Sequence, residues 1–373
     1  MGEVKENRSV SFLRGVPADE ALAALAPAVS KGYGDAIEKY GTALLQYGHF
    51  NGFEPLREVL ADLHRVRPDR IIAGNGGMEV ISLLFKSLPK GSTVLVEEIT
   101  YDRVIFDALQ YGHRLVGIRL SPDGIDLDQL KEAVADESVS AFYGIPFHHN
   151  PTGITYPEEN RRAAEEICRA RDVLCIWDIC YEPLRYDGEV NTPVSVSDWG
   201  PVLVSSFTKT ISPGTKCGYA VVPEHLLPRM TRVVANTRLN PNLPTQGVIA
   251  DFIRSGACRR YLSDLCALYT PRMAALNRAM KDHFPGGFSG EVTGGFFSCI
   301  RLKTIGPEKE QAFLDAARAA GVGITPAWDA VSPDVRAASK ESGLLIRLTF
   351  PACTPEDIAW GMGRLKEVEQ AIA

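Results

Sequence analysis

Short apolar runs alternate with amphipathic segments through the middle of the chain, and this alternation is the feature that most restricts the fold. The strand-like runs include RIIAG, STVLVEE, RLVGIRL, VSAFYGIP, VLCIWDI and PVLVSSF, and helical patterns such as GGMEVISLLFKSLP lie between them. Several runs are almost continuously apolar, as expected of strands that are buried on both faces. The pattern therefore predicts a mostly parallel central sheet with helices on both faces.

The pattern of predicted helices and strands changes near Arg254. A long helical stretch is followed by GFFSCIRL, a helix at KEQAFLDAARAAG, a strand at VGITP, LLIRLTF and a last helix. This mixture predicts a second, smaller α+β domain. We place the larger domain at residues 40–265 and build the smaller one from residues 1–39 and 266–373.

Composition favours a small-molecule ligand over a macromolecular one. The chain is 45% hydrophobic and 23% charged with a net charge of -6, and it has no block of like charge. This disfavours a nucleic acid or an anionic membrane as partner. No segment approaches the ~20 apolar residues of a membrane span, so we expect a cytoplasmic protein.

A metal site is not expected. The eight cysteines are scattered and form no C-x-x-C pair, which is typical of reduced, buried thiols. His148 and His149 are adjacent, and neighbouring side chains on a strand point to opposite faces.

Unusual polar groups follow four of the predicted strands, where the ligands of open α/β sheets bind. GNGG at 74–77 is either a simple turn or an anion site at a helix N-terminus. Asn150, before a proline, is either a turn initiator or a ligand contact. Asp178 sits inside an apolar strand, where a carboxylate is costly unless it meets a cation.

The fourth group is Lys209, in SSFTKTISPGTK. A lysine at the end of a buried strand is readily deprotonated, and its neutral amine forms Schiff bases with carbonyls. If the carbonyl belongs to pyridoxal phosphate, Asp178 pairs with the pyridinium nitrogen, while Asn150 and Tyr181 bond the phenolate oxygen. The glycine loop and Ser206 then hold the phosphate.

Three motifs carry a family resemblance: N-P-T-G from Asn150, Asp-x-x-Tyr from Asp178, and S-x-x-K-x-x-x-P-G from Ser206. With them the chain resembles the fold-type I pyridoxal-phosphate enzymes of the class I/II aminotransferase family, in the branch of the 2-aminoadipate and kynurenine aminotransferases. The resemblance covers nearly the whole chain. It implies the fold-type I transferase architecture, pyridoxal 5'-phosphate as cofactor and a homodimer with shared active sites.

The resemblance also implies roles for single residues. Lys209 would form the Schiff base and carry protons, with Asp178 and Tyr101 as the other catalytic residues, Tyr101 by stacking on the ring. Besides these three, the implied cofactor contacts are Asn75, Gly76, Gly77, Asn150, Tyr181, Ser206, Lys216 and Tyr47, the last reaching the neighbouring subunit's phosphate. Arg347 would bind the substrate α-carboxylate, with Asn150 and Arg14 as further substrate contacts.

Two of these positions depart from the family pattern. Lys216 stands where an arginine usually binds phosphate, so it offers a point charge without the guanidinium fork. Arg14 precedes Gly15 where most relatives have no side chain. It either recognises an extra anionic group of the substrate or faces solvent.

These residues are compatible with three functions. We favour an aminotransferase that moves the amino group of an L-amino acid to a 2-oxo acid through Lys209. The alternative is a pyridoxal-phosphate lyase, cyclase or oxidase of specialised metabolism, because a few side chains decide the fate of the same carbanion. A non-catalytic effector domain of a transcription factor is disfavoured, since Lys209 is kept and no DNA-binding segment precedes the first motif.

Overall fold

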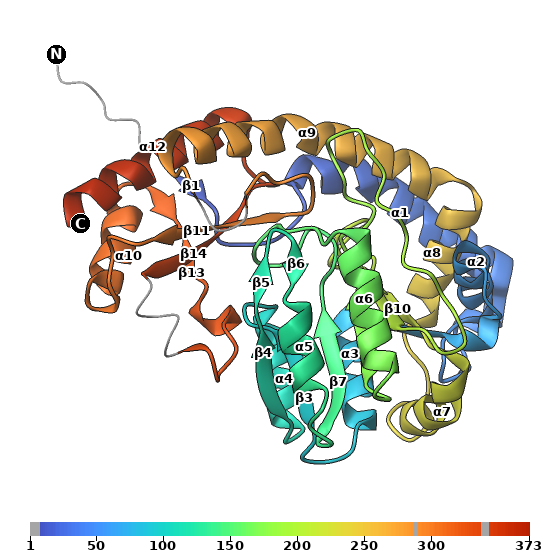
Figure 1. The fold of residues 1–373 in the computed structure, drawn as a ribbon. Coiled ribbons are helices and arrows are strands. Elements are labelled where there is room, and N and C mark those ends of the chain that lie inside the picture. The colour runs from blue at the N-terminus through green and yellow to red at the C-terminus, as the bar shows by residue number, and fades with distance from the viewer. Residues whose placement is uncertain (1–7, 287–289, 337–342) are drawn as a thin grey trace.

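The computed structural model describes residues 8–286, 290–336 and 343–373 and is built around a seven-stranded sheet (Figure 1). The strand order is β2-β10-β9-β8-β7-β3-β4. The strands are β2 (Ile71–Gly74), β3 (Thr93–Glu97), β4 (Arg114–Ile118), β7 (Val139–Gly144), β8 (Leu174–Asp178), β9 (Val202–Ser206) and β10 (Gly218–Val221). Pairs from β4 to β9 are parallel, whereas β10 is antiparallel to both neighbours. The predicted mostly parallel sheet is confirmed, and β10 is a strand that sequence reasoning missed.

Strand side chains alternate between two buried layers, because successive residues of a strand point to opposite faces. In β3, Val94 and Val96 join one layer and Leu95 joins the other. The first layer is covered by α3 (Gly77–Ser87), α4 (Asp102–Gln110) and α7 (Leu227–Ala235). The second is covered by α2 (Glu54–His64), α5 (Leu127–Ala133), α6 (Glu158–Arg169) and α8 (Leu243–Arg254). Helices on both faces explain why these strands are apolar throughout.

A smaller antiparallel sheet has the order β11-β14-β13. Its strands are β11 (Phe297–Leu302), β13 (Thr325–Pro326) and β14 (Leu344–Thr349), and they are accompanied by α9 (Ala257–His283), α10 (Glu310–Ala319) and α12 (Pro355–Ile372). Helices α9 and α12 pack side by side along the outside of this part (Figure 1). Within the described ranges, no helix has both the length and the apolarity needed to cross a membrane.

The beginning of the described chain joins this smaller part. Strand β1 (Val10–Ser11) pairs in parallel with β12 (Val322–Gly323). VGITP, predicted as one strand, instead forms the two short strands β12 and β13 in different sheets. The remaining elements are α1 (Asp19–Tyr40), the hairpin β5 (Leu120–Ser121) and β6 (Gly124–Ile125), and the 3-10 helices η1 (Gly41–Leu44), η2 (Pro68–Arg70), η3 (Glu224–Leu226), η4 (Pro307–Lys309) and η5 (Trp328–Ala330).

The carboxyl ends of β3, β7, β8 and β9 meet at one edge of the central sheet, because these strands are parallel neighbours. The smaller sheet lies against this edge: a Cβ added at Gly153, after β7, would fall 2.5 Å from the Phe297 carbonyl oxygen of β11. Only a glycine permits so close an approach of two backbones. The polar residues that end the strands therefore lie between the two sheets.

Candidate active site

Lys209 follows β9, and its side chain is directed to the N-terminal segment of the chain. Its Nζ donates a hydrogen bond of 2.8 Å to the carbonyl oxygen of Gly15. The same Nζ lies 6.0 Å from the ring centre of Tyr181 and 5.6 Å from that of Phe296. Burial lowers the pKa of the Lys209 ammonium, although nearby Cys180 and Asp178 act in the opposite direction. These apolar surroundings favour the neutral, nucleophilic amine.

Asp178 is the last residue of β8 and is buried. Its Oδ2 accepts a hydrogen bond of 2.9 Å from the Tyr143 hydroxyl, and its Oδ1 accepts one of 3.1 Å from the backbone amide of Cys180. Burial raises the pKa of the Asp178 carboxyl above its usual value. No arginine, lysine or histidine of the described ranges forms an ion pair with it. A buried carboxylate without an ion pair is stabilised by a cationic partner.

Two tyrosines lie near this pair. Tyr101 immediately precedes α4, and burial raises its pKa to about 12, with smaller contributions from Asp102 and Asp178. Tyr181 is buried, and its ring centre lies 5.9 Å from that of Phe296 and 5.8 Å from that of Phe297. Both phenols therefore remain protonated and can donate hydrogen bonds at neutral pH.

Asn150 lies in a turn that follows β7, not on a strand. The amide of Gly153 donates to the carbonyl oxygen of His149 over 2.6 Å, and His148 has a φ of 48°. The prediction that His148 and His149 occupy a strand is therefore wrong, because β7 already ends at Gly144. Asn150 itself is buried. The turn lies against the smaller sheet, since a Cβ at Gly153 would fall 2.5 Å from the Phe297 carbonyl oxygen.

Arg347 lies on β14, in the smaller sheet. Its Nη2 donates to the carbonyl oxygen of Leu13 over 3.0 Å, and its guanidinium carbon lies 5.6 Å from the ring centre of Phe297. Its Nε is buried and has no hydrogen-bond partner among the described residues. Cys299, opposite Arg347 in the sheet register, donates its Sγ–H to the carbonyl oxygen of Pro151 over 3.3 Å. This contact ties the strand of Arg347 to the turn of Asn150.

The glycine loop opens at the N-terminus of α3. A Cβ at Gly76 would meet nothing within 4 Å, so there is open space at the first turn of the helix. Ser206, at the end of β9, lies directly beside Gly77, whose ideal Cβ position is 3.3 Å from the Ser206 Cβ. Asn75 accepts a hydrogen bond of 2.9 Å from the Asn242 amide, while its own amide donates to the Glu79 carboxylate. The positive end of a helix and a serine hydroxyl thus border one open space.

Three further predicted residues are not linked to this cluster by a side-chain hydrogen bond or ion pair in the described ranges. The side chains of Arg14, Tyr47 and Lys216 are exposed and make no hydrogen bond or ion pair with the described parts of the chain. Lys216 lies in the turn just before Cys217, whose carbonyl oxygen accepts from the Ser206 hydroxyl over 3.4 Å. The structure therefore brings together Lys209, Asp178, Tyr101, Tyr181 and Arg347, and separately Asn75, Gly76, Gly77 and Ser206. Asn150 is placed only through its turn, which Cys299 ties to the strand of Arg347.

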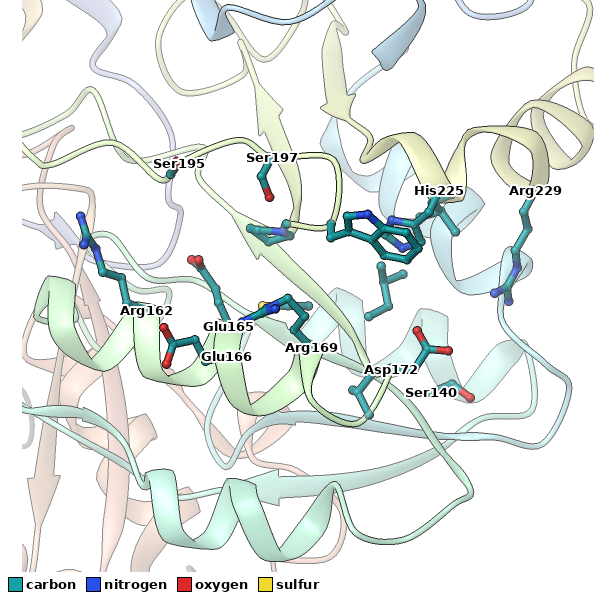
Figure 2. A pocket seen from close by; sticks show the side chains of 17 residues that line it. Ser140, Arg162, Glu165, Glu166, Arg169, Asp172, Ser195, Ser197, His225 and Arg229 are labelled. Carbon is teal, nitrogen blue, oxygen red and sulfur yellow. The ribbon is translucent and has the colours of Figure 1, made fainter.

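A cavity of about 550 Å³ at the opposite edge of the sheet does not belong to this cluster (Figure 2). Ser140, Leu174 and Pro201 line it, and they lie at the starts of β7, β8 and β9. Figure 2 also shows Glu165 and Arg169 of α6 beneath the cavity. None of the predicted site residues lines it. Ligands of parallel sheets bind at the carboxyl ends of the strands, so this cavity is not the candidate active site.

Sequence reasoning missed three contributors to the site. Tyr143 donates to Asp178, and the Gly15 carbonyl accepts from Lys209. Glu97, at the end of β3, is fully buried. The signal that identified Asp178, a carboxylate within an apolar run, was equally present at Glu97 in STVLVEE. Tyr143 carried no comparable signal, because a tyrosine in a strand is ordinary core.

The donor set fits pyridoxal phosphate. Asp178 is a buried carboxyl with two hydrogen-bond donors and no ion pair among the described residues, which suits a protonated ring nitrogen. The open space at Gly76 lies at a helix N-terminus that suits a phosphate. Lys209 supplies an amine whose pKa is lowered, as bonding to an aldehyde requires.

Comparisons with known proteins agree with this chemistry. Residues 14–365 match the model of the family "Aminotransferase class I and II". The aromatic-amino-acid aminotransferase 1 of Thermococcus litoralis is 26% identical over 98% of this chain and 88% of its own length. The multiple substrate aminotransferase of Thermococcus profundus superposes with a TM-score of 0.87 at 24% identity, covering 99% of this chain and 93% of that chain.

A further structural relative carries a cofactor derivative. The alpha-aminoadipate aminotransferase LysN of Thermus thermophilus, complexed with N-(5'-phosphopyridoxyl)-L-leucine, superposes with a TM-score of 0.84 at 24% identity, covering 99% of this chain and 94% of that chain. These likenesses confirm the predicted fold-type I architecture. The match to the family model spans nearly the whole chain. The chain therefore belongs to the class I and II aminotransferases and is an enzyme of pyridoxal-phosphate-dependent amino-group transfer.

Proposed function

We propose that Lys209 is the cofactor-bearing residue of an enzyme that moves the amino group of an L-amino acid to a 2-oxo acid. The observation that carries this proposal is the buried amine of Lys209, which lies within 6.0 Å of the ring centres of Tyr181 and Phe296 and has a lowered pKa, with Asp178 nearby. When bound, pyridoxal phosphate supplies an aldehyde that bonds to amines and a ring that withdraws electrons from the substrate α-carbon.

We assign each catalytic residue a separate role around the cofactor ring. Lys209 Nζ moves the α-proton of the substrate, which its lowered pKa supports because a base must be neutral to accept a proton. Asp178 would hold a proton on the cofactor's ring nitrogen. Tyr101 would pack against the ring, and Asn150 and Tyr181 would donate hydrogen bonds to its phenolic oxygen.

The binding residues hold the two anionic ends of the reactants. Arg347 binds the substrate α-carboxylate, for which its free Nε and guanidinium fork are suited. The phosphate is bound by a set of residues around the N-terminus of α3: Asn75, Gly76, Gly77, Ser206 and Lys216. Lys216 contributes only a point charge, so the backbone amides and the hydroxyl provide the directional contacts.

We propose that Arg14 selects substrates with a second carboxylate. Its side chain is exposed and free of any ion pair within the described ranges, and its neighbour Gly15 accepts from Lys209. Relatives are named for aromatic amino acids and for 2-aminoadipate. In this proposal Arg14→Gln lowers kcat/KM for 2-aminoadipate about tenfold and leaves that for phenylalanine within about twofold. Equal effects on both substrates would contradict it.

We also propose a homodimer. Leu45, Tyr47 and Leu239 are 69%, 75% and 68% exposed. The segments that carry them are joined, since the Gly48 amide donates to Asn240 Oδ1 over 3.3 Å. Exposed apolar side chains gathered in this way suit an interface. Tyr47 would then reach the phosphate of the partner subunit.

The dimer proposal is tested by sedimentation of the holoenzyme. Leu239→Glu places a charge in the expected interface and should raise the dimer dissociation constant at least about tenfold. Val190→Glu is the matched control, because Val190 is 86% exposed on another segment. A Leu239→Glu protein that sediments as the wild type would overturn the proposal.

We propose a cytoplasmic location because of the state of the cysteines. The eight cysteines all lie in the described ranges and form no disulfide there. Such a set suits a reducing compartment, where disulfides are rare.

The activity is tested by incubating the holoenzyme with a panel of L-amino acids and 2-oxoglutarate. The expected result is one new 2-oxo acid and one glutamate formed in equal amounts. Ammonia release or oxygen uptake without glutamate would instead favour the lyase or oxidase chemistry. No product from any amino acid would contradict the proposed transfer.

A further inference from the structure

Glu97 is a fully buried carboxylate outside the set of residues that contact reactants. It ends β3, one strand from β7 and two from β8, at the edge of the sheet where Asp178 lies. A buried carboxylate is strongly unfavourable unless hydrogen bonds or a cation compensate it. Glu97 must therefore have partners that compensate its burial.

Four groups surround the Glu97 carboxylate. Oε1 accepts from the Ile145 amide over 2.6 Å and from the Tyr156 hydroxyl over 2.7 Å. Oε2 accepts from the Thr100 hydroxyl over 2.6 Å. The Nε2 of His149 lies 3.5 Å from Oε1. All of these residues are buried, so the cluster is closed to solvent.

These contacts fasten the two turns that carry proposed cofactor contacts. Ile145 and Tyr156 stand at the two ends of the segment that contains Asn150, and the Tyr156 amide also donates to the Pro146 carbonyl oxygen over 2.9 Å. His149 immediately precedes Asn150. Thr100 immediately precedes Tyr101. One carboxylate thus links both turns to the end of a central strand.

We propose that Glu97 is a positioning residue that fixes Asn150 and Tyr101 relative to the cofactor ring. This proposal rests on the cofactor roles proposed for those two residues. In this proposal Glu97 contacts neither the cofactor nor the substrate. It acts through the segments that its carboxylate holds together.

The charge of Glu97 is what makes the link strong. Burial alone would raise the pKa of the Glu97 carboxyl, but His149 and the donors of Thr100 and Ile145 outweigh it, so the pKa lies below its usual value. A carboxylate accepts hydrogen bonds at both oxygens, and bonds to a charged acceptor are about twice as strong as neutral ones. A glutamine keeps the shape but removes the charge, so its oxygen accepts only neutral hydrogen bonds. Its NH2 group in the place of Oε2 keeps the contact with Thr100 only if that hydroxyl turns round to accept.

The test compares Glu97→Gln with Glu165→Gln. Glu165 of α6 is the control, a partly buried carboxylate that accepts from Trp177 Nε1 over 2.8 Å. Among the described residues it makes no hydrogen bond or ion pair with residues 98–101 or 145–156, unlike Glu97. The dissociation constant of pyridoxal phosphate is measured by equilibrium dialysis. We expect it to rise about tenfold in Glu97→Gln and to change less than about twofold in Glu165→Gln.

Hydrogen exchange of the cofactor-free proteins provides a second readout. The proposal predicts faster exchange in residues 98–101 and 145–156 of Glu97→Gln and unchanged exchange in α6. If Glu97→Gln does not fold, Thr100→Val and Tyr156→Phe each remove one donor, and each should raise the cofactor dissociation constant about threefold.

The outcomes separate this proposal from the proposed function. A wild-type protein that binds no pyridoxal phosphate sinks the proposed function. A wild type that binds it, with Glu97→Gln, Thr100→Val or Tyr156→Phe binding it equally well, overturns only the role of Glu97. Equal weakening by Glu97→Gln and Glu165→Gln would likewise overturn it, because a general loss of stability would then explain both.

Discussion

Lys209 and Asp178 both lie in surroundings that oppose their charges. Burial lowers the pKa of the lysine and raises that of the aspartate, and neither forms an ion pair with a described residue. Such residues destabilise a folded chain, since charged groups lose hydration without a matching partner. Their presence at one edge of the sheet is the mark of a site selected for reactivity.

The first prediction is that Lys209→Met stabilises the cofactor-free protein at about pH 7. Because the pKa of Lys209 is lowered from 10.5, the unfolded state binds a proton that the folded state resists, and this favours unfolding at neutral pH. The advantage of Lys209→Met should shrink as pH rises and vanish only above about 10.5, where the unfolded lysine also loses its proton. Urea denaturation at the two pH values measures it. A variant less stable than the wild type at pH 7 would show that the contact with Gly15 outweighs burial.

For single residues, the sequence predicts the reactive pair Lys209 and Asp178 but not the groups that form hydrogen bonds with them. Lys209 and Asp178 stand out as charges next to apolar runs. The Gly15 carbonyl that accepts from Lys209 lies 194 residues away in sequence, and Tyr143 looks like any core tyrosine. Partners of this kind come from tertiary packing, which a local pattern does not contain.

Strand β10 organises the phosphate side of the site. Gly218 pairs with Gly74 on one side and with Ser206 on the other. An added Cβ at Gly218 would lie 2.5 Å from the Gly77 nitrogen and 2.6 Å from the Gly76 carbonyl carbon. The glycine loop can therefore approach Ser206 only because β10 has no side chain at this point.

The second prediction concerns that close approach. Gly218→Ala should lower the free energy of unfolding by about 3 kcal/mol, because the clash is with backbone that cannot rotate away. It should also weaken binding of pyridoxal phosphate. Gly214→Ala is the control, since its nearest neighbour is the Ser212 Oγ at 3.6 Å, an ordinary contact. Thermal unfolding of both variants measures the difference, and equal melting temperatures would refute the prediction.

The elements themselves were predictable where the chain alternates between strand and helix patterns. The runs that end in Asp178 and Ser206 became β8 and β9. The alternating pattern does not predict strand β10, because β10 follows β9 through a loop, with no helix between the two strands. VGITP was misread as one strand because a sequence does not show where a bend moves the chain into another sheet.

At the scale of the whole molecule, buried neutral histidines set the response to acid. Burial lowers the pKa of His148 to about 3 and that of His64 to about 4, from 6.5. Above about pH 6.5 both states are neutral and these residues do not affect stability. As the pH falls, the unfolded state takes up protons that the folded state refuses.

The third prediction is that His64 and His148 each lower the free energy of unfolding by about 2 kcal/mol between about pH 7 and pH 5. Glu182 acts in the opposite direction, because burial raises its pKa to about 7 and its protonation in the folded state adds stability over the same range. His64→Gln should therefore remove about 2 kcal/mol of this acid destabilisation relative to the wild type, as measured by urea denaturation of both proteins across the range. An equal pH dependence of the two proteins would contradict the lowered pKa of His64.

The division of the chain into two domains stays a prediction. The two sheets match the regions expected from composition, with the central sheet within 40–265 and the smaller one within 266–373. Helix α9, however, runs from Ala257 to His283 through the predicted boundary at 265. A continuous helical pattern carries no mark at the point where one packing environment gives way to another, so a boundary inside it is set by tertiary contacts.

The central claim, that Lys209 bears pyridoxal phosphate, has a direct test. The holoenzyme is reduced with borohydride, digested, and the peptides are weighed by mass spectrometry, with Lys216 as the internal control in the same loop. The account predicts a pyridoxyl phosphate adduct on Lys209 and none on Lys216, and no adduct at all in Lys209→Met. An adduct on another lysine, or none on the wild-type protein, would contradict it.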